Sequence, residues 1–167
     1  MAYVSYEEFC TIYGADVMDE PVFNRISWRA SKIVDNITTG VDGYAKLKNA
    51  FPILEDDAMA VRYCVCEIIN ILGIIEKTEN AAQTAQGYVS SDDGTVHSSL
   101  VSSVSSGSES VTYATGSNAI GNTALAQAAT STERRAALIY NVAREYLSGV
   151  TDANGINLLY GGVYPYV

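Results

Sequence analysis

The chain has 167 residues, of which 48% are hydrophobic and only 17% charged; ten basic against nineteen acidic residues give a net charge of −9. This length suits one domain, and so few basic residues argue against specific recognition of DNA or RNA, which needs clustered lysine and arginine. We expect no membrane span, since we find no run of about 18 apolar residues, and no signal peptide at residues 1–10, which lack a basic start and a long apolar stretch.

A short helix is predicted near the N-terminus. Ser5 followed three residues later by Glu8 is a capping box, in which each side chain accepts the other residue's free backbone N–H. The box predicts a helix from Tyr6 to about Tyr13, and Gly14 is expected to end it.

A second helix is predicted from Glu20-Pro21, because proline suits the first turn of a helix. Apolar residues then recur at steps of three and four, which marks one helix face: Phe23, Ile26, Ala30, Ile33 and Ile37. The other sides carry Arg25, Arg29 and Lys32. Gly40 is predicted as the C-terminal cap, and a short amphipathic turn or helix follows within residues 41–52.

The third predicted helix begins at Asp56-Asp57, whose charges suit the positive end of a helix dipole. One stripe of this helix comprises Ala58, Val61, Val65, Ile68, Leu72 and Ile75, and Cys64, Ile69, Ile71 and Ile74 broaden it. A helix that is apolar on most sides is usually central. It packs on two neighbours at once, or on its own subunit and another.

The residues from 88 to 117 are rich in serine and carry two strand-like runs, Val96–Val104 and Ser110–Ala114, around a turn-forming cluster. Two interpretations stay open: a disordered linker, or a long β-hairpin inserted between helices. An isolated hairpin is only marginally stable, so an ordered one needs a partner, for which a neighbouring subunit is the obvious candidate. Its contact residues would be Val96, Leu100, Val101, Val104, Val111 and Tyr113.

A last helix is predicted from a capping box of Thr130 and Glu133. Its apolar face comprises Leu138, Val142 and Tyr146 with Ile139, Ala143 and Leu147. The tail from 155 to 167 is apolar, aromatic and uncharged. Exposed apolar patches mark contact sites, so the tail either docks on its own domain or is an arm for a partner, and the residues leave both open.

Catalytic and metal-binding patterns are weak in this sequence. The lone His97 stands in the serine-rich segment without the rigid geometry and orienting carboxylate that a Ser–His pair needs. The three cysteines, Cys10, Cys64 and Cys66, fit neither a CxxC pair nor a zinc site. They are expected to be small apolar residues in a reducing compartment. We therefore expect no enzyme, no cofactor and no metal.

Two short motifs bracket the last helix: SESVTY at 108–113 and GINLLYGGV at 155–163. In these motifs and in the order of its elements, most of the chain resembles the head–tail connector (adaptor, head-completion) proteins of long-tailed bacteriophages. Many of those proteins have an SxSVxY-like hairpin strand and a GLLYRGV-like tail. Gly161 stands where that tail often has a basic residue, which weakens any charge contact there.

The residues and the resemblance together indicate a mainly α fold: a small helical bundle with an inserted β-hairpin and an extended C-terminal arm. Residues 1–150 would form a single helical connector domain with a serine-rich hairpin insertion at 84–117, and residues 151–167 the arm. The resemblance implies that the arm binds the portal protein through Leu158, Leu159, Tyr160, Val163, Tyr164 and Tyr166.

The function that the resemblance implies is structural: a homo-oligomeric ring, usually dodecameric, between the portal and the tail of the virion. The ring would complete the head and extend the DNA channel. Its partners would be other copies, the portal protein and the next neck or tail protein, with no membrane and no sequence-specific DNA contact. It would be made in the host cytoplasm and lie at the head–tail junction.

The net charge suggests a further role during DNA ejection, since negative charge around a channel repels phosphate and keeps DNA from sticking. Two alternatives to the connector stay open. One is another neck or tail-completion protein. The other is a small helical binding or regulatory module with a disordered serine-rich linker.

Overall fold

The computed structural model describes residues 2–85, 88–90, 96–98, 103–106, 109–112 and 124–165, with side chains for 2–80 and 124–165. The described part contains six helices, so the prediction of a mainly α protein is confirmed. Two compact units are present. We call Met1–Gly73 with Ala136–Val167 the helical unit, and Ile74–Arg135 the insertion unit.

The first helix, α1, spans Tyr6–Tyr13 and has the predicted capping box. The Ser5 hydroxyl accepts the Glu8 N–H at 3.2 Å, and the Glu8 carboxylate accepts the Ser5 N–H at 2.8 Å. Gly14 follows the helix with a φ of 94°, a conformation that favours glycine. Both predicted ends of this helix are therefore confirmed.

The second helix, α2, spans Glu20–Thr38 with proline in its first turn, as predicted. Its buried face also contains polar residues, whose hydroxyls donate to backbone carbonyls one turn earlier: Ser31 to Ser27 and Thr38 to Val34, both at 2.9 Å. The helix ends two residues before Gly40, so the prediction that Gly40 caps it is wrong.

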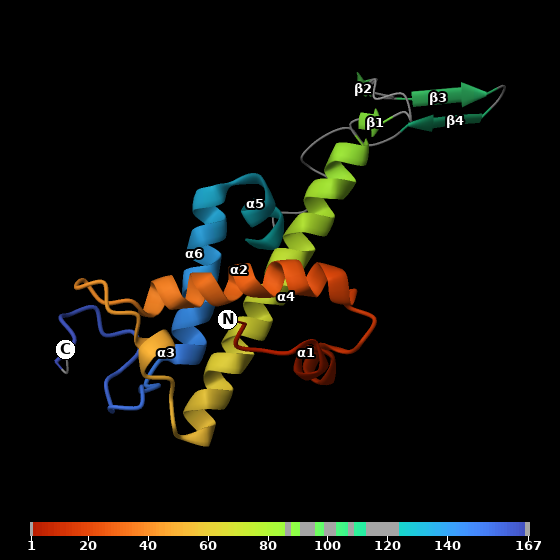
Figure 1. Cartoon of the computed structure of the whole chain (residues 1–167). Coiled ribbons are helices and arrows are strands. Elements are labelled where there is room, and N and C mark those ends of the chain that lie inside the picture. Colours follow the sequence, from red (N-terminus) through yellow and green to blue (C-terminus); the bar gives the residue numbers. More distant parts are fainter. Residues whose placement is uncertain are drawn as a thin grey trace. The chain divides into compact units, whose positions relative to one another are not determined.

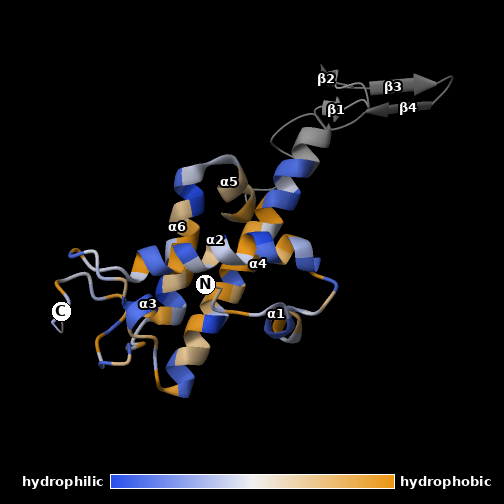
Figure 2. Cartoon of the chain, viewed as in Figure 1, coloured by the Kyte–Doolittle hydropathy of each residue, from blue (hydrophilic) through white to orange (hydrophobic). Residues whose placement is uncertain are grey.

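The longest helix, α4 (Glu55–Ala85), supplies much of the core of the helical unit. Between Val61 and Leu72 its buried residues join those of the N-terminal helices, α6 (Thr132–Leu147) and the C-terminal segment in one hydrophobic cluster. Figure 1 shows α2 and α6 beside α4, and Figure 2 shows apolar residues along the middle of α4. The predicted central helix is confirmed.

By length and composition alone, Glu55–Asn80 of α4 is also apolar enough to cross a membrane, contrary to our expectation from the sequence. Within this stretch, 56% of the 18-residue window that is apolar enough is buried inside the protein, as in the core helix of a helical domain. Three acidic residues open the helix, and Arg62 and Glu67 interrupt its apolar run. Packing in the protein core is therefore sufficient to explain why α4 is so apolar.

The predicted apolar face of α6 is only half correct. Ile139, Ala143 and Leu147 are buried, whereas Leu138 and Val142 are partly buried and Tyr146 is exposed. The buried set has steps of four and covers a narrow stripe of the helix. The broader face that we predicted from the sequence is therefore in part a surface of the protein.

In the insertion unit, α5 (Ala124–Thr130) precedes the start of α6. The predicted capping box of Thr130 and Glu133 is wrong, because the Thr130 hydroxyl donates to the Gln127 carbonyl at 3.1 Å. Ser131 instead accepts the Arg134 N–H at 3.4 Å. The chain thus breaks at Ser131 into two helices rather than continuing as one.

Four short strands lie between α4 and α5: β1 (Tyr88–Ser90), β2 (Val96–Ser98), β3 (Ser103–Ser106) and β4 (Glu109–Thr112). They pair antiparallel two by two, β1 with β2 and β3 with β4. These short pairs do not support the single inserted β-hairpin that we predicted. Of its contact residues, Val96, Val104 and Val111 lie in the strands; outside the described residues lie Leu100, Val101 and Tyr113.

Candidate interaction site at the C-terminal segment

The C-terminal segment, Thr151–Pro165, folds back on the helical unit. Its first residue is tied to the start of α4, because the Thr151 N–H and hydroxyl both donate to one oxygen of Asp57, at 3.0 and 2.8 Å. The next residue, Asp152, closes a turn by accepting the N–H groups of Asn154 and Ile156, each at 2.9 Å. Hydrogen bonds of Thr151 and Asp152 thus fix the position of the segment where it begins.

Lys46 is the centre of the site. It opens the short helix α3 (Lys46–Asn49) and is fully buried. Its ammonium donates to the carbonyls of Thr38 and Leu158, both at 2.9 Å, and of Tyr160 at 2.5 Å. An ammonium has three N–H donors, so all three are used. We call this arrangement the lysine clamp.

The clamp joins elements that are distant in sequence. Thr38 ends α2, where backbone carbonyls lack partners within the helix and a positive charge is favoured. The other two carbonyls belong to the C-terminal segment. Burial lowers the pKa of the Lys46 ammonium, while the nearby Asp152 and Asp42 carboxylates act in the opposite direction.

Tyr164 is the second anchor of the segment and is buried. Its hydroxyl donates to Asp152 at 2.5 Å and accepts from the Asn154 amide at 2.8 Å, and its ring stacks on Tyr44 with centroids 4.1 Å apart. Its backbone N–H donates to Asp42 at 2.8 Å, and this bond is the main reason why the pKa of Asp42 is lowered. Burial, together with the Asp152 carboxylate, raises the pKa of Tyr164.

A close approach of two loops completes the site. The Val41 N–H donates to the Gly161 carbonyl at 3.3 Å. A Cβ atom added to Gly40 would lie 2.8 Å from the carbonyl oxygen of Gly162, which is closer than such atoms pack. Position 40 therefore needs glycine, because the backbone of Gly162 leaves no room for a side chain there.

Three apolar side chains remain exposed around this close approach. Val41 is 79% exposed, Val163 67% and Tyr160 49%. We call these three residues the tail patch. A buried clamp thus holds a small apolar surface in a fixed position, and the segment is neither wholly core nor a free arm.

The residues predicted for the portal-binding arm differ in their exposure to solvent. Leu158 and Tyr164 are buried in their own domain and are not available as anchors for a partner, because they pack in the helical unit. Leu159 is partly buried against the core. Tyr160 and Val163 are exposed, and Tyr166 lies outside the described residues.

Sequence reasoning missed the three charged residues that position the segment, Asp42, Lys46 and Asp152. The available signal was weak. Asp152 is the last charge before an uncharged tail, and Lys46 lies in a short amphipathic stretch. Burial of a lysine follows from contacts more than one hundred residues apart in the chain, which no local pattern reveals.

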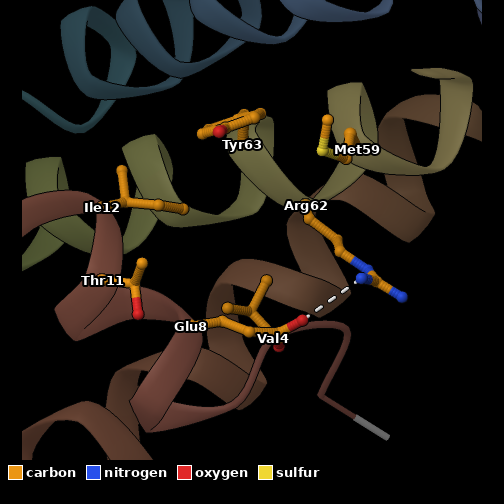
Figure 3. A pocket seen from close by; sticks show the side chains of 7 residues that line it. All are labelled: Val4, Glu8, Thr11, Ile12, Met59, Arg62 and Tyr63. Carbon is orange, nitrogen blue, oxygen red and sulfur yellow. Dashed lines mark hydrogen bonds and ion pairs between the residues drawn. The ribbon is translucent and has the colours of Figure 1, made fainter. Parts of the chain in front are cut away.

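A second surface feature of the helical unit is a pocket of about 190 Å³ between α1 and α4 (Figure 3). It is lined by Val4, Glu8, Thr11, Ile12, Met59, Arg62 and Tyr63. Glu8 accepts from Ser5, which lowers its pKa, and pairs with Arg62 at 3.2 Å. The two charged residues of the lining therefore already have partners, and the remaining lining offers mainly apolar contact.

Within the part of the chain that the structure describes, no group of three or more His, Cys, Asp or Glu residues could hold a metal ion. Cys64 and Cys66 are buried, which raises the pKa of each thiol to about 12 and leaves little reactive thiolate at neutral pH. Comparisons with protein-family models, curated proteins and solved structures find no match to this chain.

Proposed function

We propose that this chain is a structural protein of the neck of a long-tailed bacteriophage, a head–tail connector that forms a ring between portal and tail. The order of elements supports it: a short capped helix, a proline-started helix, a long apolar helix, a serine-rich segment and a last helix before a glycine-rich tail. The ring would complete the head and extend the channel through which DNA leaves.

The observation that carries the proposal is the tail patch on its clamp. The tail motif GINLLYGGV divides into residues that fix the backbone and residues that face outward: Leu158 is buried, while Tyr160 and Val163 are exposed. A contact surface that is already ordered loses less conformational entropy on binding. An apolar patch on a rigid support is thus suited to dock on a large partner.

We propose that the tail patch binds the portal protein. In this proposal Val41, Tyr160 and Val163 make the contact, and Leu158 and Tyr164 act only by holding the segment in place. The serine-rich segment would lie between copies in the ring, with Val96, Val104 and Val111 among its contacts. The net charge of −9, repeated around the ring, would repel DNA phosphates in the channel.

A pull-down with the portal protein from the same genome tests the assignment. The variant Tyr160→Ser/Val163→Ser removes apolar surface that is exposed and leaves the clamp intact. The matched control is Tyr140→Ser, which removes another exposed tyrosine from α6 in the same unit.

We expect the wild type and the control to bind the portal protein, and the double variant to lose at least tenfold in affinity. Binding of all three with equal affinity would contradict the role of the tail patch. Binding of the wild type to the tail-tube protein instead of the portal protein would favour a tail-completion role. No binding to either would favour the helical binding module.

A further inference from the structure

The exposed face of α2 carries a group of residues that the proposed function does not use. Arg25, Trp28, Arg29 and Lys32 are spaced by three, four and seven residues, so they lie on one side of the helix. All four are exposed, and Trp28, the only tryptophan of the chain, is 58% exposed. We call this surface the basic stripe.

The composition makes the basic stripe unusual. The chain has only ten basic residues, and three of them surround its single tryptophan here. Arg29 and Lys32 have no hydrogen-bond or ion-pair partner among the described residues. The helix does not need these side chains for packing, because its buried face is the opposite one. Tryptophan and arginine are the residues most enriched at the energetic centres of interfaces.

A surface of complementary character lies where α4 begins. Ile53 and Leu54 are adjacent and highly exposed, at 78% and 65%, and the next two residues, Glu55 and Asp56, are exposed acids. We call these four residues the acidic knob. In Figure 1 the start of α4 lies at the lower edge of the helical unit, away from the middle of α2. The acidic knob and the basic stripe therefore lie at different helices of the unit.

We infer that copies of this chain associate head to tail, with the acidic knob of one copy seated on the basic stripe of the next. Ile53 and Leu54 would cover the exposed ring of Trp28, and Glu55 and Asp56 would pair with Arg29 and Lys32. A contact between two different surfaces of the same chain leaves one of each free, so it continues into a ring or a filament. The inference rests on the proposed function, since a connector ring needs such a contact.

A second copy fits the basic stripe better than a nucleic acid. A nucleic acid supplies phosphates for the cations and bases to stack on Trp28, but it leaves the exposed Ile53 and Leu54 unexplained. The net charge of −9 also opposes approach to a polyanion. The acidic knob supplies both the negative charge and the apolar contact that the basic stripe lacks.

Two complementary variants of the full chain test the inference by sedimentation velocity, together with acrylamide quenching of the single tryptophan. The stripe variant is Arg29→Glu/Lys32→Glu, and the knob variant is Ile53→Ser/Leu54→Ser. The control, Lys48→Glu/Arg144→Glu, reverses two other exposed charges in the helical unit. Circular dichroism checks that each variant is folded. Protein is raised to about 1 mM, which detects even a weak contact.

We expect the wild type and the control to form oligomers in which Trp28 becomes at least twofold less accessible to quencher. Each variant alone should stay monomeric. An equal mixture should form one-to-one dimers that grow no further, because one intact knob meets one intact stripe. Added salt should weaken the contact.

Three outcomes would overturn the inference. They are a wild type that stays monomeric at the highest concentration, a variant that assembles like the wild type, and protection of Trp28 by double-stranded DNA in a chain that does not self-associate. A pull-down with the portal protein keeps the two proposals separate. Portal binding without the knob–stripe contact would leave the proposed function standing, and the contact without portal binding would leave only the self-association.

Discussion

Replacing Lys46 with methionine tests whether the lysine clamp holds the C-terminal segment. Methionine keeps most of the apolar stem but removes the ammonium, so the carbonyls of Thr38, Leu158 and Tyr160 lose their shared donor. A buried polar group left unpaired costs about 1–3 kcal/mol. The cost of burying an ammonium disappears at the same time, and the lowered pKa of Lys46 shows that this cost is present. For three carbonyls the cost of losing the donor amounts to about 3–9 kcal/mol, and loss of the buried ammonium offsets part of it, so we expect a net loss of about 2–5 kcal/mol.

Two measurements check this prediction. Urea unfolding followed by circular dichroism gives the loss in free energy of unfolding, and hydrogen exchange with mass spectrometry reports on the backbone of Thr151–Pro165. Lys48→Met is the control, because Lys48 lies on the same helix and is exposed, so its replacement should change stability by less than about 0.5 kcal/mol. Equal stability of the two variants, with unchanged exchange in the C-terminal segment, would refute the clamp.

Three further changes address the core, the close approach and the pH dependence. Leu72→Ala should cost about 2–5 kcal/mol in urea unfolding, because Leu72 is buried; a loss near zero would contradict its place in the core. Gly40→Ala should cost about 1–3 kcal/mol, because its new Cβ would press on Gly162; an unchanged unfolding midpoint would contradict the close approach. Asp42, whose pKa lies below its usual 3.8, stabilises the fold above that pH and loses this effect as pH falls through the lowered value. In the variant Asp42→Asn, the free energy of unfolding should therefore decrease less than in the wild type as the pH is lowered from about 6 to about 2. An equal decrease in both proteins would refute this.

Local signals predicted the first half of the fold well. The box of Ser5 and Glu8 gave both the start of α1 and its hydrogen bonds, and proline placed the start of α2 correctly. The nearly all-round apolar pattern of α4 identified the core helix. These features depend on residues within one or two helical turns, where the chain itself determines the contacts.

The candidate site depends on contacts that local patterns do not contain. Gly40 looked like a helix cap but is required by the backbone of Gly162, and Thr130 looked like a cap where Ser131 serves instead. Whether the tail would dock or extend was open because both outcomes suit an apolar segment. The hydrogen bonds of the buried Lys46 hold the tail on its own unit. These bonds form only when α2, α3 and the C-terminal segment lie together.

Electron cryomicroscopy of the full chain mixed with the portal protein of the same genome tests the proposed function most directly. We predict a ring of copies on the portal in which Tyr160 and Val163 touch the portal surface and successive copies meet through α2 and the start of α4. A bare portal, or a bound ring in which both of these side chains face solvent, would contradict the proposal.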